Sequence, residues 1–89
     1  MTLTQLKYVL AIAKAGTINA AAKQLFISQP TLSSAVKELE AELGISLFNR
    51  TSKGVEPTAD GEEFLSYARQ VVMQTDLIEE RYLGTAPAK

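Results

Sequence analysis

Residues 28–43 read SQPTLSSAVKELEAEL, and their large apolar side chains recur with the period of an α-helix. Ser28 suits the N-cap because its hydroxyl can accept from amides of the next turn. Pro30 falls in the first turn, where its missing N–H costs nothing, and Gly44 is a natural end for the helix. One face, within about 60° of arc at roughly 100° per residue, carries Leu32, Val36, Leu39 and Leu43. The sequence therefore predicts an amphipathic helix that begins at Ser28.

Two shorter helical patterns precede this helix. Apolar spacings of three and four predict a first helix that is capped by Thr2 or Thr4 and stops at Gly16. A second helix, capped by Thr17 or Asn19, is short and is followed by only two residues before the next cap. Its apolar face consists of small and branched side chains that permit a close helix crossing: Ile18, Ala21, Ala22 and Leu25.

A small hairpin is predicted after the third helix. Residues 45–50 and 55–58 have the pattern of two short strands, and Gly54 in the connecting turn can adopt a positive φ. Pro57 limits ladder pairing beyond that point.

The last predicted element is a long helix capped by Thr58 that reaches Tyr82 or Leu83. At about 1.5 Å per residue, a helix of about 25 residues spans about 40 Å, more than the preceding residues can cover. Part of its apolar stripe is therefore expected to pack on a second copy, although the stripe could instead pack wholly on the first helix. The predicted dimerisation residues are Phe64, Ala68, Val71, Thr75, Ile78 and Tyr82.

The predicted fold class is mostly α, a winged helix-turn-helix with a three-helix core and a small β-hairpin wing, followed by a long linker or dimerisation helix. Residues 1–57 would form the winged domain and residues 58–83 the linker helix. Residues 84–89 would form a tail or the start of a linker.

Composition excludes several function classes. The chain of 89 residues has no Cys and no His, which removes disulfides, thiolate or imidazole metal sites, and nucleophile–histidine catalysis. Adjacent acids such as Glu62 and Glu63 diverge by about 100° on a helix and cannot share a substrate atom. We expect no enzyme activity, no catalytic residue, no metal and no cofactor.

The apolar run at residues 8–13 is too short for a membrane span, so we expect a cytoplasmic protein without a membrane partner.

The charge is unevenly distributed along the chain, although the net charge is only −1. Residues 1–37 contain four lysines and no acid, whereas residues 55–89 contain three cations and seven carboxylates. The N-terminal part is therefore where a polyanion such as double-stranded DNA could bind.

Two short helices joined by a tight turn form the arrangement that enters a DNA major groove. The amide of Gln29 can pair with adenine, and the hydroxyls of the same turn can meet base edges. Carboxylates appear from Glu38 onward, so only the first two to three turns should enter the groove. Arg50 and Lys53 flank the hairpin turn and could contact the backbone or the adjacent minor groove. The predicted DNA contacts are Ser28, Gln29, Pro30, Thr31, Ser33, Ser34, Lys37, Arg50 and Lys53.

The sequence closely resembles the N-terminal domain of LysR-type transcriptional regulators over residues 3–83. The motifs that carry this resemblance occur in order and are Gly16-Thr17, Ala20-Ala21-Ala22, Ser28-Gln29-Pro30-Thr31-Leu32-Ser33, Leu47-Phe48-Asn49-Arg50, Lys53-Gly54-Val55 and Thr58-Ala59-Asp60-Gly61. The resemblance implies a homodimer formed through the long helix and bound to an interrupted palindrome. It also implies that a small-molecule inducer acts only through a C-terminal domain absent from this chain. Ser34, Lys37 and Lys53 stand where Arg is common, which implies weaker binding or another base preference.

An alternative interpretation is a protein-interaction module that oligomerises through its long helix and does not bind DNA. The net acidity motivates it. Dimerisation without retention on DNA at low salt would favour this alternative.

Overall fold

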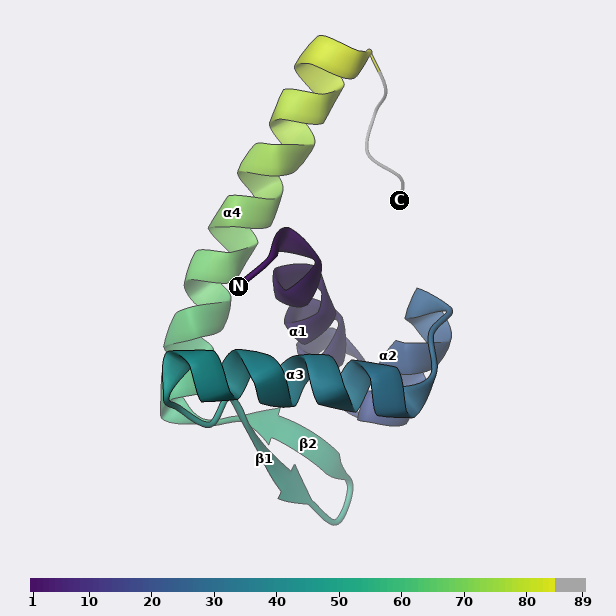
Figure 1. The fold of residues 1–89 in the computed structure, drawn as a ribbon, viewed down its shortest axis with the longest axis vertical. Coiled ribbons are helices and arrows are strands. Elements are labelled where there is room, and N and C mark those ends of the chain that lie inside the picture. Colours follow the sequence, from purple (N-terminus) through teal and green to yellow (C-terminus); the bar gives the residue numbers. More distant parts are fainter. Residues whose placement is uncertain (85–89) are drawn as a thin grey trace.

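The structure, a computed structural model, describes residues 1–84 and is mostly helical (Figure 1). Its elements are, in order, α1 (Leu3–Ala15), α2 (Ile18–Leu25), α3 (Gln29–Leu43), β1 (Phe48–Thr51), β2 (Gly54–Pro57) and α4 (Ala59–Leu83). This arrangement confirms the winged helix-turn-helix followed by a long helix. Gly84 ends α4 in the left-handed conformation, and the rest of the predicted tail, residues 85–89, lies outside the described residues.

The caps of the first three helices resolve the choices that the sequence left open. Thr2 caps α1 and forms a capping box with Gln5, whose side chain accepts from the Thr2 amide at 2.9 Å. Thr17 caps α2, and its hydroxyl accepts from the Ala20 amide at 3.0 Å. Ser28 caps α3 as expected. Each cap satisfies an amide that the helix itself leaves unpaired, so the bounds of the helices follow from local chemistry.

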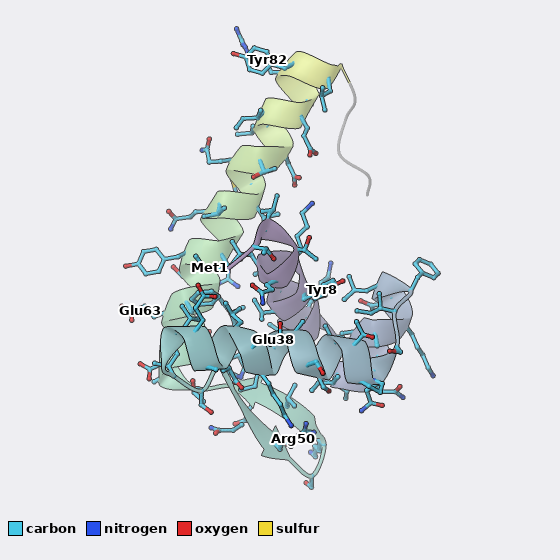
Figure 2. The ribbon with its side chains drawn as sticks, viewed as in Figure 1. Met1, Tyr8, Glu38, Arg50, Glu63 and Tyr82 are labelled. Atoms are coloured by element: carbon cyan, nitrogen blue, oxygen red, sulfur yellow. The ribbon has the colours of Figure 1, made fainter. Side chains whose placement is uncertain are left out.

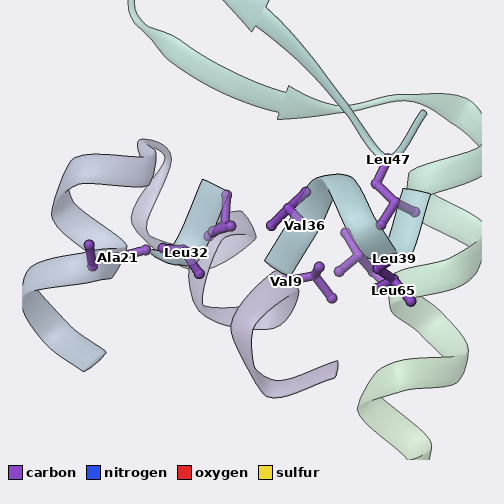
Figure 3. Packing of buried hydrophobic residues seen from close by; sticks show 9 residues of the cluster. Val9, Ala21, Leu32, Val36, Leu39, Leu47 and Leu65 are labelled. Carbon is purple, nitrogen blue, oxygen red and sulfur yellow. The ribbon is translucent and has the colours of Figure 1, made fainter. Parts of the chain in front are cut away.

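The core lies where α1, α2, α3 and the start of α4 meet. α3 contributes its predicted face, and Leu32 and Leu39 are fully buried against Val9 of α1 and Ala21 of α2 (Figure 3). Leu47, from the segment between α3 and β1, and Leu65 of α4 complete the same cluster. This shared core fixes the outer face of α3 relative to the rest of the chain.

The turn between α2 and α3 contains an unexpected backbone conformation. Phe26 ends α2 with φ of 60°, in the left-handed region that a bulky residue adopts at a cost. Its side chain is 95% exposed. The Ile27 amide donates to the Ala22 carbonyl at 3.1 Å, so the chain turns within two residues and α3 begins directly after α2.

The wing is the antiparallel hairpin of β1 and β2, with Phe48 paired with Pro57 and Thr51 paired with Gly54. The predicted strand at residues 45–50 was wrong at its start, because β1 begins only at Phe48. The Leu47 amide donates to the Glu40 carboxylate of α3 at 2.7 Å and not to a carbonyl of a neighbouring strand. The predicted strand at residues 55–58 was shifted by one residue because Thr58 leaves the ladder to cap α4.

α4 consists of a packed first half and a projecting second half (Figure 1). Close packing at the start requires Gly61, since a Cβ there would lie 2.0 Å from the Leu47 carbonyl oxygen. Leu65 of α4 belongs to the same hydrophobic core as the winged domain. The predicted boundary at residue 58 therefore marks the start of a new helix, whereas the hydrophobic core continues across it. Among residues 1–84, no helix combines the length and apolar character that a bilayer-spanning helix requires.

Candidate nucleic-acid interface

The outer face of α3 is polar and open to solvent. Four exposed residues border one open surface hollow: Pro30, Thr31, Ser34 and Glu38. Glu38 is labelled on α3 in Figure 2. Ser28 is engaged locally, because its hydroxyl accepts from the Thr31 amide at 3.2 Å and donates to the Thr31 hydroxyl at 2.8 Å. The hydroxyl of this predicted DNA contact is therefore already used in the cap of α3.

The remaining predicted contacts line two depressions between α3 and the wing. The linings of both depressions include Ile18, Arg50 and Val55, and we call the two together the trough. Ser33 and Lys37 line the part near the middle of α3, and Gln29 lines the part near its start. Arg50 lines both parts from β1, while Lys53 borders the part near the hairpin turn. The fold thus brings together five of the predicted residues from two elements that are separated in sequence.

The cations of this face carry no competing partner. Among residues 1–84 the structure pairs none of Lys37, Arg50 and Lys53 with a carboxylate, and the ion pair found there joins the Met1 ammonium to Glu42 at 2.7 Å. Glu40 also lines the trough, but its carboxylate accepts from the Leu47 amide. The three cationic heads are therefore available to an external anion.

The sequence interpretation missed the contribution of α2 to the trough. Thr17, Ile18 and Asn19, at the start of α2, line it beside Gln29 and the wing. The sequence placed Thr17 and Asn19 only as alternative caps, and no local pattern indicates that the wing folds back beside them. The link is a long-range hydrogen bond from the Val55 amide to the Gly16 carbonyl at 2.9 Å.

The predicted dimerisation stripe divides into covered and exposed residues. Ala68 is only 2% exposed and Phe64 packs against the core of its own chain, so Ala68 was wrongly assigned to an intermolecular contact. Thr75 is half-buried. Val71, Ile78 and Tyr82 are exposed, together with Tyr67, which the sequence interpretation did not include. Tyr82 lies at the end of α4 farthest from Arg50 (Figure 2).

This fold, with a polar helix face beside a cationic wing, defines a winged helix-turn-helix DNA-binding domain. Residues 3–62 match the family described as bacterial regulatory helix-turn-helix protein, lysR family. The chain belongs to this family. Among residues 1–84, no group of three or more carboxylate, His or Cys side chains is placed to hold a metal ion.

Relatives and solved structures agree with this assignment. The HTH-type transcriptional regulator ClcR of Pseudomonas putida is 44% identical over 81 residues, which are 91% of this chain and 28% of ClcR. The HTH-type transcriptional regulator BudR of Klebsiella aerogenes is 42% identical over 97% of this chain and 60% of BudR. The crystal structure of the CbnR_DBD-DNA complex superposes with a TM-score of 0.86 at 40% identity, covering 94% of this chain and 97% of that one. This chain thus spans less than a third of the ClcR sequence.

Proposed function

We propose that this chain is the DNA-binding part of a sequence-specific transcription regulator, with the start of α3 in the major groove and the wing on the adjacent backbone or minor groove. One observation carries the proposal: the unpaired cations of the wing face the polar first turns of α3 across the trough. The likeness to a CbnR_DBD-DNA complex supports this docking. A regulator of bacterial chromosomal DNA would act in the cytoplasm, by binding and not by catalysis.

The proposed active form is a homodimer joined through what we call the exposed stripe of α4. It consists of four exposed residues, Tyr67, Val71, Ile78 and Tyr82, with half-buried Thr75 among them. A two-fold dimer uses the same patch on both copies. Val71 and Ile78 lie equally far from the middle of the stripe, as do Tyr67 and Tyr82. In an antiparallel pair of helices, Val71 of one copy would therefore lie beside Ile78 of the other, and Tyr67 beside Tyr82. Such a dimer would bind two inverted half-sites, which is an interrupted palindrome.

The absence of cysteine makes this pairing directly testable. In an antiparallel dimer, Thr75→Cys lies near the two-fold axis and should cross-link to itself on mild oxidation, whereas Val71→Cys should not. A parallel dimer would cross-link both variants. A monomer would cross-link neither and would contradict the dimer proposal.

Response to a small-molecule inducer is proposed to reside in a domain beyond this chain, because ClcR is more than three times as long. The chain alone should bind DNA without responding to metabolites.

The DNA-binding proposal is tested by titrating specific and random duplexes at several salt concentrations. Affinity should fall steeply with salt on both, because phosphate neutralisation releases counterions. The specific duplex should retain an advantage at each concentration. Equal affinity for both duplexes throughout would contradict sequence-specific binding, and dimerisation without retention on DNA would favour a protein-interaction module.

A further inference from the structure

The third turn of α3 carries a carboxylate that the rest of the chain leaves free. α3 contains three carboxylates, and the sequence pattern predicts only that they mark the end of groove contact. In the structure their surroundings differ. The Glu40 carboxylate accepts from the Leu47 amide at 2.7 Å, and the Glu42 carboxylate pairs with the Met1 ammonium at 2.7 Å. Within the described part of the chain, the exposed carboxylate of Glu38 has neither an ion pair nor a hydrogen bond.

Glu38 shares its surface with three of the proposed DNA contacts. It borders the open hollow on the outer face of α3 together with Pro30, Thr31 and Ser34. Among the described residues, no cation lines this hollow. A cation at position 34 would lie one turn before Glu38 and would pair with it, but Ser34 is short and neutral. The Glu38 carboxylate is therefore open to whatever binds the outer face of α3.

The base edges of the major groove determine what such a carboxylate can accept. Guanine and thymine present acceptor atoms there, which repel a carboxylate. Adenine has its N7 acceptor beside its amino group, whereas cytosine offers its N4 amino group without an adjacent acceptor. A carboxylate that loses its water in the groove without gaining a hydrogen bond is destabilised. Cytosine is therefore the base that suits a carboxylate in the major groove.

We infer that Glu38 recognises a cytosine in each half-site and rejects the other bases there. This inference rests on the proposed function and extends it, because it assigns a specificity-determining residue outside the predicted contacts. Glu38 follows Gln29 by nine residues, which is about 13 Å along the helix. At about 3.4 Å per base pair, its cytosine lies within about four base pairs of the one that Gln29 contacts. In a two-fold dimer the cytosine occurs once in each half-site.

The test replaces the carboxylate by groups with other hydrogen-bonding patterns. In Glu38→Gln the amide both donates and accepts, which is the pattern that pairs with N7 and N6 of adenine. The preferred base should therefore change from cytosine to adenine at one position of both half-sites. The parent chain should bind the cytosine duplex about tenfold more tightly than duplexes with another base there, whereas Glu38→Ala should bind all of them with similar affinity.

The matched control is Glu63→Gln, which makes the same change at an exposed position of α4 (Figure 2). It should keep the cytosine preference of the parent chain. Enrichment of bound duplexes from a random pool identifies the position. Competition binding with duplexes altered at that base pair then measures the preference of each variant.

Three results would overturn the inference while leaving DNA binding intact. Equal gains in affinity on every duplex for both Glu38 variants would make Glu38 only a charge that repels phosphates. An unchanged preference at every base pair in both variants would place Glu38 outside the groove. Loss of the cytosine preference in Glu63→Gln as well would assign the effect to net charge. Absence of specific binding by the parent chain would instead overturn the proposed function itself.

Discussion

The face formed by α3 and the wing and the exposed stripe of α4 are both open surfaces, yet they differ in chemistry. Residues 1–57 carry six cations and four carboxylates, whereas residues 58–89 carry three cations and six carboxylates. The first surface presents hydroxyls, an amide and unpaired cations, and the second presents Val71, Ile78 and two tyrosines. The excess of carboxylates thus lies on α4, away from the face proposed to bind a polyanion, and this helix is the proposed contact with a second copy.

The two surfaces also differ in how they are held. The first turns of α3 bury Leu32 and Val36 in the core cluster, and the wing is hydrogen-bonded to the turn before α2 through the Val55 amide and the Gly16 carbonyl. The second half of α4 has no support from its own chain in the core cluster, which reaches no further along the helix than Leu65. The proposed DNA-binding surface is thus formed before any ligand binds, whereas the proposed dimer stripe would gain its packing only from a second copy.

The largest expected effect is a loss of stability at the start of α4, where Gly61 packs against the backbone of Leu47. Gly61→Ala would place a Cβ against the Leu47 carbonyl, and the backbone has no flexible side chain to move aside. We expect the free energy of unfolding to fall by about 3 kcal/mol. Urea unfolding followed by circular dichroism measures it. Ser66→Ala, at an exposed position of the same helix, should stay within about 0.5 kcal/mol of the parent chain. Equal stability of the two variants would show that Gly61 is not tightly packed against Leu47.

The next effect separates the stripe from the remainder of α4. Ile78→Glu should weaken dimerisation by about a hundredfold, because the carboxylate would be buried among apolar side chains. Met73→Glu is the matched control, since Met73 is 60% exposed and Ile78 57%, but the two differ by about 140° around the helix. Sedimentation equilibrium measures both. Similar weakening in the two variants would show that the stripe is not the dimer contact.

A smaller effect distinguishes base recognition from backbone binding within the first surface. Gln29→Ala should cost about 2 kcal/mol on the preferred duplex and nearly nothing on a duplex altered at one base pair. Gln24→Ala, at an exposed position in the last turn of α2, should not change the preference. Competition binding with single-base variants of the duplex measures this. A uniform loss for Gln29→Ala would assign it to the backbone.

The smallest effect concerns the wing cation. Lys53→Ala should lower the salt slope by about 0.9 and reduce affinity on all sequences to a similar extent. Lys7→Ala removes the same charge from an exposed position of α1 and should leave the slope unchanged. Fluorescence anisotropy over a range of salt concentrations provides the slopes. Suppose that Lys53→Ala changed the sequence preference but left the salt slope unchanged. Lys53 would then neither bind a phosphate nor act by its charge in the minor groove.

The helices could be predicted from the sequence because their signals are local. Leu32 and Leu39 mark the buried face of α3, and Ser28 and Gly44 mark its ends. The wing was predicted less accurately because its bounds depend on distant partners. The Glu40 carboxylate accepts a hydrogen bond from the Leu47 amide, and this bond keeps the segment before Phe48 out of the strand ladder.

The site followed the same rule. The proposed contacts on α3 follow from one polar helical face, and those on the wing from the cations beside a hairpin turn. The part of the trough at Asn19 could not be predicted, because it exists only where the wing docks on the Gly16 carbonyl. Likewise, periodicity alone could not show that Ala68 is covered by its own chain while Ile78 is not.

The central claim is that two copies joined through α4 each present α3 to one half-site. Enrichment of bound duplexes from a random pool tests it most directly. The account predicts enriched sequences with two inverted half-sites whose centres are separated by about 10 base pairs or a multiple of that spacing. Enrichment of a lone half-site, of half-sites without fixed spacing, or of no sequence at all would contradict it.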